Sequence, residues 1–210
     1  MDKPDWHFIE GVCGTEIISL TRIGEAMRKI FFQMMLSVDG FFEGPNREID
    51  WHNVDDEFND YAIEMLNKVD LLIFGRITYD LMNSYWPTKE AMTNDPIVAG
   101  LMNSLPKIVY SKTIEKAEWN NTRLVKEVNP DEILKIKNEP GKDIAVFGSS
   151  DLVITLNKHR LIDEFRIFIN PLILGSGKAL LKGITTPIKL KFINTRTFSN
   201  GNVLLCYEPI

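Results

Sequence analysis

The sequence predicts an α/β fold whose central sheet is mostly parallel and ends in an antiparallel hairpin. Short apolar runs, typical of strands buried on both faces, alternate with segments in which apolar residues recur at helical spacing. Near the end of the chain, Ser199-Asn200-Gly201 joins two strand-like runs, and Asn-Gly is a strong hairpin signal. These observations indicate one sheet with helices packed on its faces.

The predicted strands follow one another along the chain. Ile30 to Leu36 is an apolar run broken only by Gln33, which predicts a strand buried on both faces. The Asp39-Gly40 pair then turns the chain. Further strands are predicted at 71–74, 108–110, 122–125, 144–147 and 165–169, followed by a hairpin of strands at 188–198 and 203–207.

Helical spacing and helix-end signals fill the segments between these strands. One face of the first such segment carries Phe58, Ala62, Met65 and Leu66. Acidic residues occupy its first turn, where the helix dipole favours them. Pro130 opens a later helix, because proline is well tolerated at the first helical position. Helices are therefore predicted at 55–67, 77–82, 95–103, 130–139 and 152–159.

Composition places the chain among globular proteins with one domain. Its 210 residues, 44% of them hydrophobic and 25% charged, suffice for one packed core. The net charge of −5 and the lack of a basic stripe argue against nucleic acid as a partner. No apolar run approaches the ~18–20 residues of a membrane span. Cys13 and Cys206 make no disulfide framework, which fits a reducing, cytoplasmic compartment.

The first 26 residues differ from the rest of the chain. They lack the basic start, continuous apolar stretch and cleavage site of a signal peptide, and strand-like sequence begins only after Met27. We therefore expect residues 1–26 to be an N-terminal extension that is not native, and residues 27–210 to form one domain. A genuine arm that takes part in dimer contacts is the alternative.

The segment Phe74-Gly75-Arg76-Ile77-Thr78 leads from a predicted buried strand into a predicted helix. A helix N-terminus offers free N–H groups and partial positive charge, and an adjacent arginine adds a permanent one. Glycine permits close approach of the backbone. The segment therefore predicts a phosphate site. The alternative is a solvated arginine beside a locally packed threonine.

Two further segments have the same character. Phe147 leads into Gly148-Ser149-Ser150 at the start of another helix, where small residues permit close approach of a ligand. An ordinary turn with a serine cap is the alternative there. Ser111 follows the strand at 108–110, with Lys112 and Thr113 beside it. All three segments follow the carboxyl ends of strands, where ligands sit in open α/β sheets.

The order of these segments resembles the dihydrofolate reductase superfamily, particularly the branch containing the reductase domain of bacterial riboflavin biosynthesis. The resemblance spans nearly all of 28–210. It implies a dihydrofolate-reductase-like three-layer sandwich. It also implies NADPH-dependent hydride transfer to a small heterocycle, of riboflavin-pathway pyrimidine or pterin type, often in a homodimer. The motifs that carry it are Ser37-Val38-Asp39-Gly40-Phe41, Gly75-Arg76-Ile77-Thr78-Tyr79, Lys107-Ile108-Val109-Tyr110-Ser111, Val146-Phe147-Gly148-Ser149, Leu161-Ile162-Asp163-Glu164 and Asn170-Pro171-Leu172-Ile173-Leu174-Gly175-Ser176-Gly177.

The resemblance also implies roles for particular residues. It assigns the cofactor's phosphates to the turn Gly75-Arg76-Ile77-Thr78 and places Ser111 near the adenosine phosphate. Gly148 and Ser149 line the pyrophosphate and nicotinamide side. The family commonly has a second glycine where this chain has Ser149.

The proton donor is expected among acidic residues near Trp51. In dihydrofolate reductases an acid opens the helix that follows a tryptophan, and Asp56 has the best spacing here. An acid in an apolar cleft has a raised pKa and can deliver a proton. Asp39 is the rival acid, although both residues also suit capping or turn roles. Phe41, Trp51 and Trp86 are candidate walls of the substrate pocket, although aromatic residues are more often core.

Other motifs do not carry chemistry. Gly175-Ser176-Gly177-Lys178 lacks the first glycine of a Walker A loop, and Ala179 stands where Ser or Thr should bind magnesium. His7, His52 and His159 have no metal-ligand spacing, so no metal is expected. A clear basic pocket for a sugar phosphate is also lacking.

Two functions remain open from the sequence. The first is an NADPH-dependent reductase acting on a small heterocycle. The second is a non-catalytic, dimeric nucleotide-binding or regulatory module that keeps the fold. Ser149 bears on this choice, because a side chain at that position would crowd the cofactor.

Overall fold

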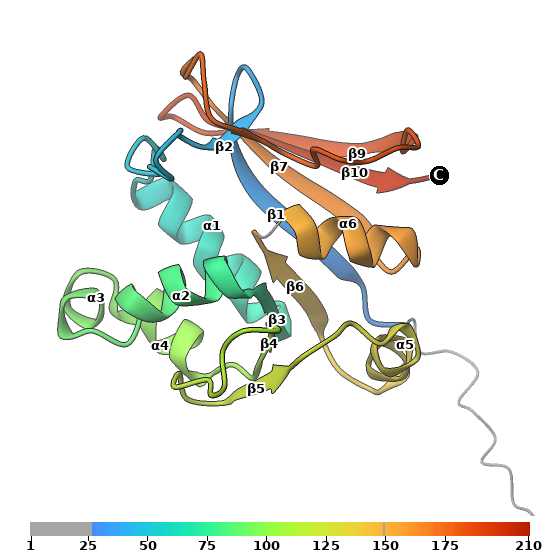
Figure 1. Cartoon of the computed structure of the whole chain (residues 1–210). Helices are drawn as coiled ribbons and strands as arrows, with labels where there is room; N and C mark the ends of the chain where they lie inside the picture. Colours follow the sequence, from blue (N-terminus) through green and yellow to red (C-terminus); the bar gives the residue numbers. More distant parts are fainter. Residues whose placement is uncertain (1–26, 149) are drawn as a thin grey trace, which may run out of the picture.

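The computed structural model describes residues 27–148 and 150–210. Eight strands form one sheet that runs through the described domain (Figure 1). The expected extension over residues 1–26 lies outside the described residues, and so does Ser149. From one edge of the sheet to the other, the strands are β5 (Thr122–Val125), β4 (Lys107–Tyr110), β3 (Val69–Gly75), β6 (Asp143–Phe147), β1 (Ile30–Ser37), β7 (Glu164–Asn170), β10 (Val203–Pro209) and β9 (Leu190–Thr197).

The pairing confirms the predicted mostly parallel sheet. The six strands from β5 to β7 run parallel to their neighbours. The hairpin of β10 and β9 adds the antiparallel pairs, and it lies at the end of the sheet opposite β4 and β5 (Figure 1). Parallel strands need crossover connections, which explains the helices between them.

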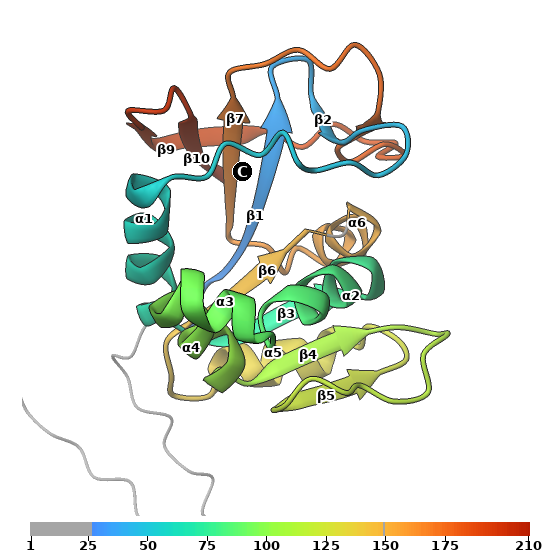
Figure 2. The same cartoon turned by 90° about the vertical axis from the view of Figure 1, so that its left-hand side faces the viewer.

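Helices cover both faces of the sheet and complete the predicted three layers. Side chains of α1, α2 and α4 join the core on one face, whereas α5 and α6 cover the other. Helix α4 lies against α1, with α3 beside α4 (Figure 2). The helices are α1 (Asp56–Asn67), α2 (Arg76–Tyr85), α3 (Lys89–Asn94), α4 (Pro96–Ser104), α5 (Pro130–Asn138) and α6 (Ser150–Lys158).

Alternation along the strands divides the core between the two faces. In β3, Leu72 and Phe74 pack with α1, α2 and α4, while Leu71 and Ile73 pack toward α5 and α6. Both sets are almost fully buried. This explains the continuous apolar runs of the sequence, because each parallel strand has two covered faces.

Three short elements were not predicted. Helix α3 buries only Ala91, so its sequence carries no apolar stripe. Strands β2 (Phe41–Glu43) and β8 (Lys178–Ala179) pair with each other in a separate two-stranded sheet. The glycine-rich segment before Lys178, with positive φ at Gly175 and Gly177, leads into β8.

Buried asparagines hold the loop between β2 and α1 against the sheet. Asn53 donates its backbone N–H to Asn170 Oδ1 at 2.9 Å, and its carbonyl accepts from Asn202 Nδ2 at 2.6 Å. Asn170 and Asn202 are fully buried, where each hydrogen bond stabilises an otherwise costly polar group. These contacts fix the loop over residues 44–55 at the carboxyl end of the parallel strands.

Candidate functional site

The three predicted anion-binding turns lie at the same edge of the sheet. In the register of the parallel strands, Gly75 pairs with Tyr110 and Phe74 pairs with Phe147. The turns that begin at Arg76, Ser111 and Gly148 therefore leave neighbouring strands at nearly the same level. This is the carboxyl edge, where open α/β sheets bind ligands.

The N-terminus of α2 has the features of an anion site. Gly75 is its N-cap residue and makes no side-chain hydrogen bond to the helix, and the first turn contains no acidic residue. The first N–H groups of α2 therefore lack a side-chain cap. Arg76 stands at the first helical position and pairs with Asp80 at 3.1 Å. Both side chains are nearly half exposed, so the pair is weak and a phosphate can compete for the arginine.

Gly148 joins this turn to the next one. Its φ of +60° is in the left-handed region, which favours glycine. A Cβ atom at Gly148 would lie 2.5 Å from Thr78 Oγ1, so the backbone of one turn packs directly on the side chain of the other. The neighbouring Ser149 lies outside the described residues. Two strand-to-helix turns thus meet at this edge of the sheet.

The two other predicted serines have local partners. Ser111 Oγ accepts hydrogen bonds from the N–H groups of Thr113 and Ile114, each at 3.2 Å. Ser150 is buried, and its Oγ accepts from Leu181 N–H at 3.0 Å. The Ser111 hydroxyl therefore stabilises its own loop, whereas the Ser150 hydroxyl holds the distant segment at Leu181.

A cavity of about 430 Å³ opens beside the two joined turns. Its walls come from β1, β2, α1, α2, the start of α4 and the start of α6. Among the predicted site residues, Ile77, Thr78, Trp86, Gly148 and Ser150 line it. Further lining side chains that the sequence did not single out are Gln33, Phe42, Glu43, Asn59, Tyr85, Asp95 and Lys178.

The predicted acids lie outside the cavity lining. Asp56 is exposed at the first position of α1, while Phe58, Asn59 and Ala62 of the same helix line the cavity. The expectation that Asp56 lies in an apolar cleft is therefore wrong. The phase of the helix turns that side chain outward, and its neighbour Asp55 caps the helix by accepting from Phe58 N–H at 2.9 Å.

Asp39 has a structural role in its turn. The Ser37 hydroxyl donates to Asp39 at 2.7 Å, and this hydrogen bond is the main cause of a lowered pKa. The N–H groups of Leu174 and Gly175 also donate to the carboxylate. A carboxylate held in its charged form by three donors is a poor proton donor at neutral pH.

Two of the three aromatic residues predicted to wall the substrate pocket, Phe41 and Trp51, do not line the cavity. Phe41 packs on Gly177 within the β2–β8 pair, and the next residue, Phe42, faces the cavity instead. Trp51 donates its indole N–H to the Glu48 carbonyl at 3.0 Å and stacks edge-on against His52, with ring centroids 4.5 Å apart. Trp51 therefore supports a lining residue without lining the cavity itself.

His52 is an uncharged wall of the cavity at neutral pH. Burial lowers its pKa to about 4, although a hydrogen bond to the Phe42 carbonyl raises it in part. Its Nε2 is buried and makes no hydrogen bond within the described residues.

Asp95 brings a carboxylate into the cavity wall. It is the N-cap residue of α4, yet its side chain makes no capping hydrogen bond. Instead it accepts from Asn59 Nδ2 at 3.0 Å and from the Tyr85 hydroxyl at 3.3 Å. Donors from α1 and α2 thus hold this carboxylate at the cavity, and the sequence offered only a helix-start signal there.

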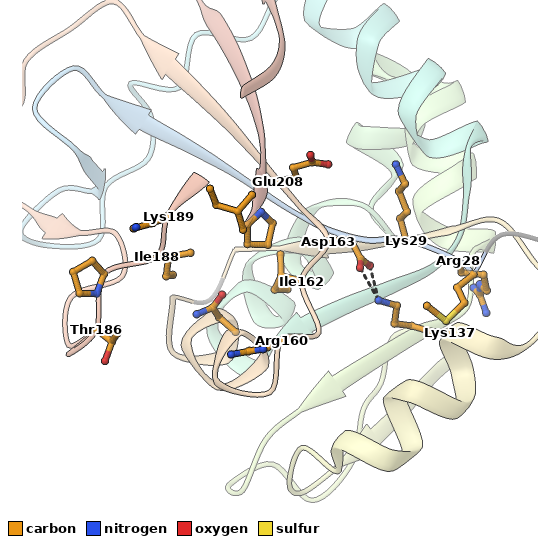
Figure 3. A pocket seen from close by; sticks show the side chains of 15 residues that line it. Arg28, Lys29, Lys137, Arg160, Ile162, Asp163, Thr186, Ile188, Lys189 and Glu208 are labelled. Carbon is orange, nitrogen blue, oxygen red and sulfur yellow. Dashed lines mark hydrogen bonds and ion pairs between the residues drawn. The ribbon is translucent and has the colours of Figure 1, made fainter. Parts of the chain in front are cut away.

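A second cavity, of about 900 Å³, lies at the opposite, amino-terminal edge of the parallel strands (Figure 3). Basic side chains dominate its lining, but Lys137 is engaged by Asp163 at 2.6 Å. The labelled basic side chains Lys29, Arg160 and Lys189 point in different directions in Figure 3. The three predicted turns all lie at the other edge, so the 430 Å³ cavity is the candidate site.

The described residues contain neither a cluster of metal ligands nor a membrane-spanning helix. Within residues 27–148 and 150–210, no group of three or more His, Cys, Asp or Glu side chains is placed to hold a metal ion. In the same part of the chain, no helix has the length and apolar character needed to cross a membrane.

The fold and the joined turns define a dihydrofolate-reductase-like α/β protein. The RibD C-terminal domain family model matches residues 28–204, and the chain belongs to this family. The chain is 36% identical to the uncharacterized protein YyaP of Bacillus subtilis strain 168, over 86% of this chain and 95% of YyaP.

Solved structures share the fold. A protein of Shewanella sp. PV-4 whose name refers to riboflavin biosynthesis superposes with a TM-score of 0.66 at 22% identity, over 87% of this chain and 99% of its own. The dihydrofolate reductase of Enterococcus faecalis, solved with NADP(H), gives a TM-score of 0.57 at 14% identity, over 86% and 96% of the two chains. The predicted fold and family are thereby confirmed.

Proposed function

We propose that the chain is an NADPH-dependent reductase of a small heterocyclic substrate. The observation that carries this proposal is the contact between the Gly148 backbone and Thr78, which joins two strand-to-helix turns in the wall of the cavity. The joined turns suit a dinucleotide's phosphates, and the cavity has the size of a small-molecule site.

The cofactor's phosphates fit the residues at this edge. The first N–H groups of α2 and the Arg76 guanidinium supply donors and positive charge. Gly148 leaves space where any side chain would meet Thr78. The N-terminus of α6 is the weaker anion site, because Asp151 stands in its first turn. When bound, NADPH supplies the hydride for the reduction.

The cavity walls orient the substrate and exclude water. Phe58, Met82 and Trp86 give an apolar surface next to the joined turns. A mostly apolar site from which water is excluded strengthens each polar contact within it.

The source of the proton remains a prediction. The exposed position of Asp56 does not support that residue as the proton donor. The variant Asp56→Asn tests this role, because turnover should stay unchanged if the proton comes from elsewhere.

Assembly and compartment belong to the same proposal. We propose a homodimer in the cytoplasm, with the exposed edge strand β9 as part of the interface. Leu190 and Phe192 of β9 are 42% and 55% exposed, and an unpaired strand edge favours association with another chain. Cys206 is buried as a free thiol, which suits a reducing compartment.

Turnover with a panel of pyrimidines and pterins tests the proposed activity. The expected result is loss of NADPH absorbance that depends on one class of ring and on enzyme concentration. Arg76→Ala should raise the NADPH concentration needed for half-maximal rate. NADPH binding without turnover on any ring would instead favour the non-catalytic module.

A further inference from the structure

Gln33 interrupts the apolar run of β1 and brings an amide to the wall of the 430 Å³ cavity. Its backbone carbonyl accepts from Gly148 N–H at 3.3 Å, so the residue lies directly beside the joined turns. Its side-chain Oε1 accepts from the Tyr61 hydroxyl at 2.8 Å. Tyr61 belongs to α1 but does not line the cavity. The oxygen of the amide therefore points toward a residue behind the wall.

Tyr61 is held in place by the aromatic side chains around it. Its side chain is 8% exposed, and its ring centroid lies between 5.2 and 6.2 Å from those of Phe58, Phe168 and Phe198. Burial raises the pKa of its hydroxyl, which therefore stays protonated at neutral pH. The hydroxyl is thus a fixed hydrogen-bond donor beside β1.

Arg166 determines which end of the Gln33 amide meets this hydroxyl. It lies next to Gln33 in the register of β1 and β7, and its charge acts on the Tyr61 phenol. The guanidinium is held by Glu164, which accepts from Nε at 2.6 Å, and lies 3.6 Å from the Phe31 ring centroid. A guanidinium has only donors, so it faces the lone pairs of the phenol oxygen and leaves the O–H for an acceptor. The amide oxygen, and not the nitrogen, is that acceptor.

The amide nitrogen of Gln33 is therefore the end that is left for the cavity. It makes no hydrogen bond within residues 27–148 and 150–210, and it is not among the described side-chain atoms that are buried without a partner. A donor that is accessible and oriented by a fixed neighbour is a pre-organised contact for a ligand.

We propose that Gln33 donates its side-chain N–H to a ring carbonyl of the ligand, and that Tyr61 is the positioning residue that sets this direction. The placement of a heterocycle in this cavity comes from the proposed function, on which this inference rests. Without the Tyr61 hydroxyl the amide can rotate and present its oxygen, which repels a carbonyl. The contact thus selects rings that turn an acceptor toward β1.

Calorimetric titration of the full chain with uracil and with pterin, which both carry ring carbonyls, tests the proposal. Gln33→Met removes the amide at similar length and should weaken ring binding about two- to tenfold, the usual value of one hydrogen bond. Tyr61→Phe should weaken it by a similar factor. Tyr207→Phe removes a hydroxyl from β10, away from the cavity lining, and should leave ring binding unchanged.

A double variant separates positioning from packing. In the Gln33→Met background, Tyr61→Phe should have no further effect on ring binding, because the amide that it orients is gone. A hydroxyl that only supported the packing of α1 would lower the affinity by the same factor in both backgrounds. The side-chain amide resonances of Gln33 provide a second readout, since they should shift when the ring is added. This readout uses the unaltered chain, so it stands even if a variant fails to fold.

Three outcomes would each overturn the inference: additive effects of the two substitutions, Gln33 amide resonances that do not shift, or no saturable binding of either ring at millimolar concentration. An NADPH titration on the same samples separates this result from the proposed function. Loss of NADPH binding with ring binding that still depends on Gln33 would reject the reductase and leave this contact standing. NADPH-dependent turnover with additive variants would do the reverse.

Discussion

Arg76 supplies the only permanent positive charge in the first turn of α2, and Asp80 competes for it. The two side chains are 41% and 49% exposed, so their pairing contributes little to stability and opens readily. A bound phosphate would form shorter, charge-assisted hydrogen bonds with the same guanidinium. The ion pair therefore sets the resting position of Arg76 without blocking its proposed role.

Arg76→Ala is expected to weaken NADPH binding by about 1.5 to 3 kcal/mol, or about tenfold to a hundredfold in Kd, because charge-assisted contacts are lost. Asp80→Asn should tighten binding about twofold, since it frees the arginine from a weak pair. Fluorescence titration with NADPH measures both. Equal affinities in all three proteins would contradict the assigned site.

Gly148→Ala is expected to lower the free energy of unfolding by about 2 kcal/mol or more. The residue has φ of +60°, and the new methyl group would meet Thr78. Gly100→Ala is the matched control, because that glycine lies in α4 with open space around it. It should stabilise the chain by about 0.5 to 1 kcal/mol. Urea unfolding measures both, and equal effects would show that the two turns do not pack as described.

His52 is expected to make stability depend on pH. Its pKa is about 4 in the folded chain and 6.5 when unfolded, so the unfolded chain binds the extra proton between these values. Stability should therefore fall as pH drops from 6.5 toward 4, by about 2 to 3 kcal/mol between pH 7.5 and 4.5. His52→Gln should remove this part of the slope, while exposed His159→Gln keeps it. Urea unfolding at both pH values is the measurement, and identical slopes would disprove a buried neutral ring.

The regular elements follow from local sequence far better than the site does. Strand β5 has the predicted bounds, and α1 begins within one residue of its prediction, because apolar runs and helical spacing report burial directly. Helix α3 and strands β2 and β8 escape prediction because they are short and bury few apolar residues. Their place depends on contacts between distant segments.

The residues of the candidate site likewise divide into those predictable from local sequence and those placed by contacts between distant segments. The turn at Arg76 and the glycine at 148 were predictable, because a strand, small residues and a helix start leave a local pattern. His52 and Asp95 were missed, since each enters the wall through tertiary contacts of a loop or a helix end. Asp56 was misplaced because spacing from a tryptophan does not determine the phase of the helix that follows.

Strand β9 is the exposed edge of the sheet and the proposed dimer contact. Phe192→Lys should shift the chain from dimer to monomer, because it places a charge in an apolar edge. Ile173→Lys makes the same change at a 73% exposed loop position and should leave the dimer intact. Analytical ultracentrifugation distinguishes the species. A wild-type monomer, or a Phe192→Lys dimer of unchanged stability, would refute this interface.

At the scale of the whole molecule, an anion-favouring helix end and a ligand-sized cavity lie side by side at the carboxyl edge of the sheet. The α2 N-terminus with Arg76 favours anions, whereas the adjoining cavity is lined mostly by apolar side chains. The loop over 44–55, fixed by Asn53, and the β2–β8 pair close the cavity on one side. This arrangement suits a phosphate-bearing cofactor beside a small ring.

Titration of the full chain with NADPH tests the cofactor site most directly. The structure predicts saturable binding of one NADPH per chain, weakened by added salt and by Arg76→Ala but not by Asp56→Asn. The absence of saturable binding at millimolar NADPH, or binding that ignores both salt and Arg76, would contradict a dinucleotide site at the joined turns.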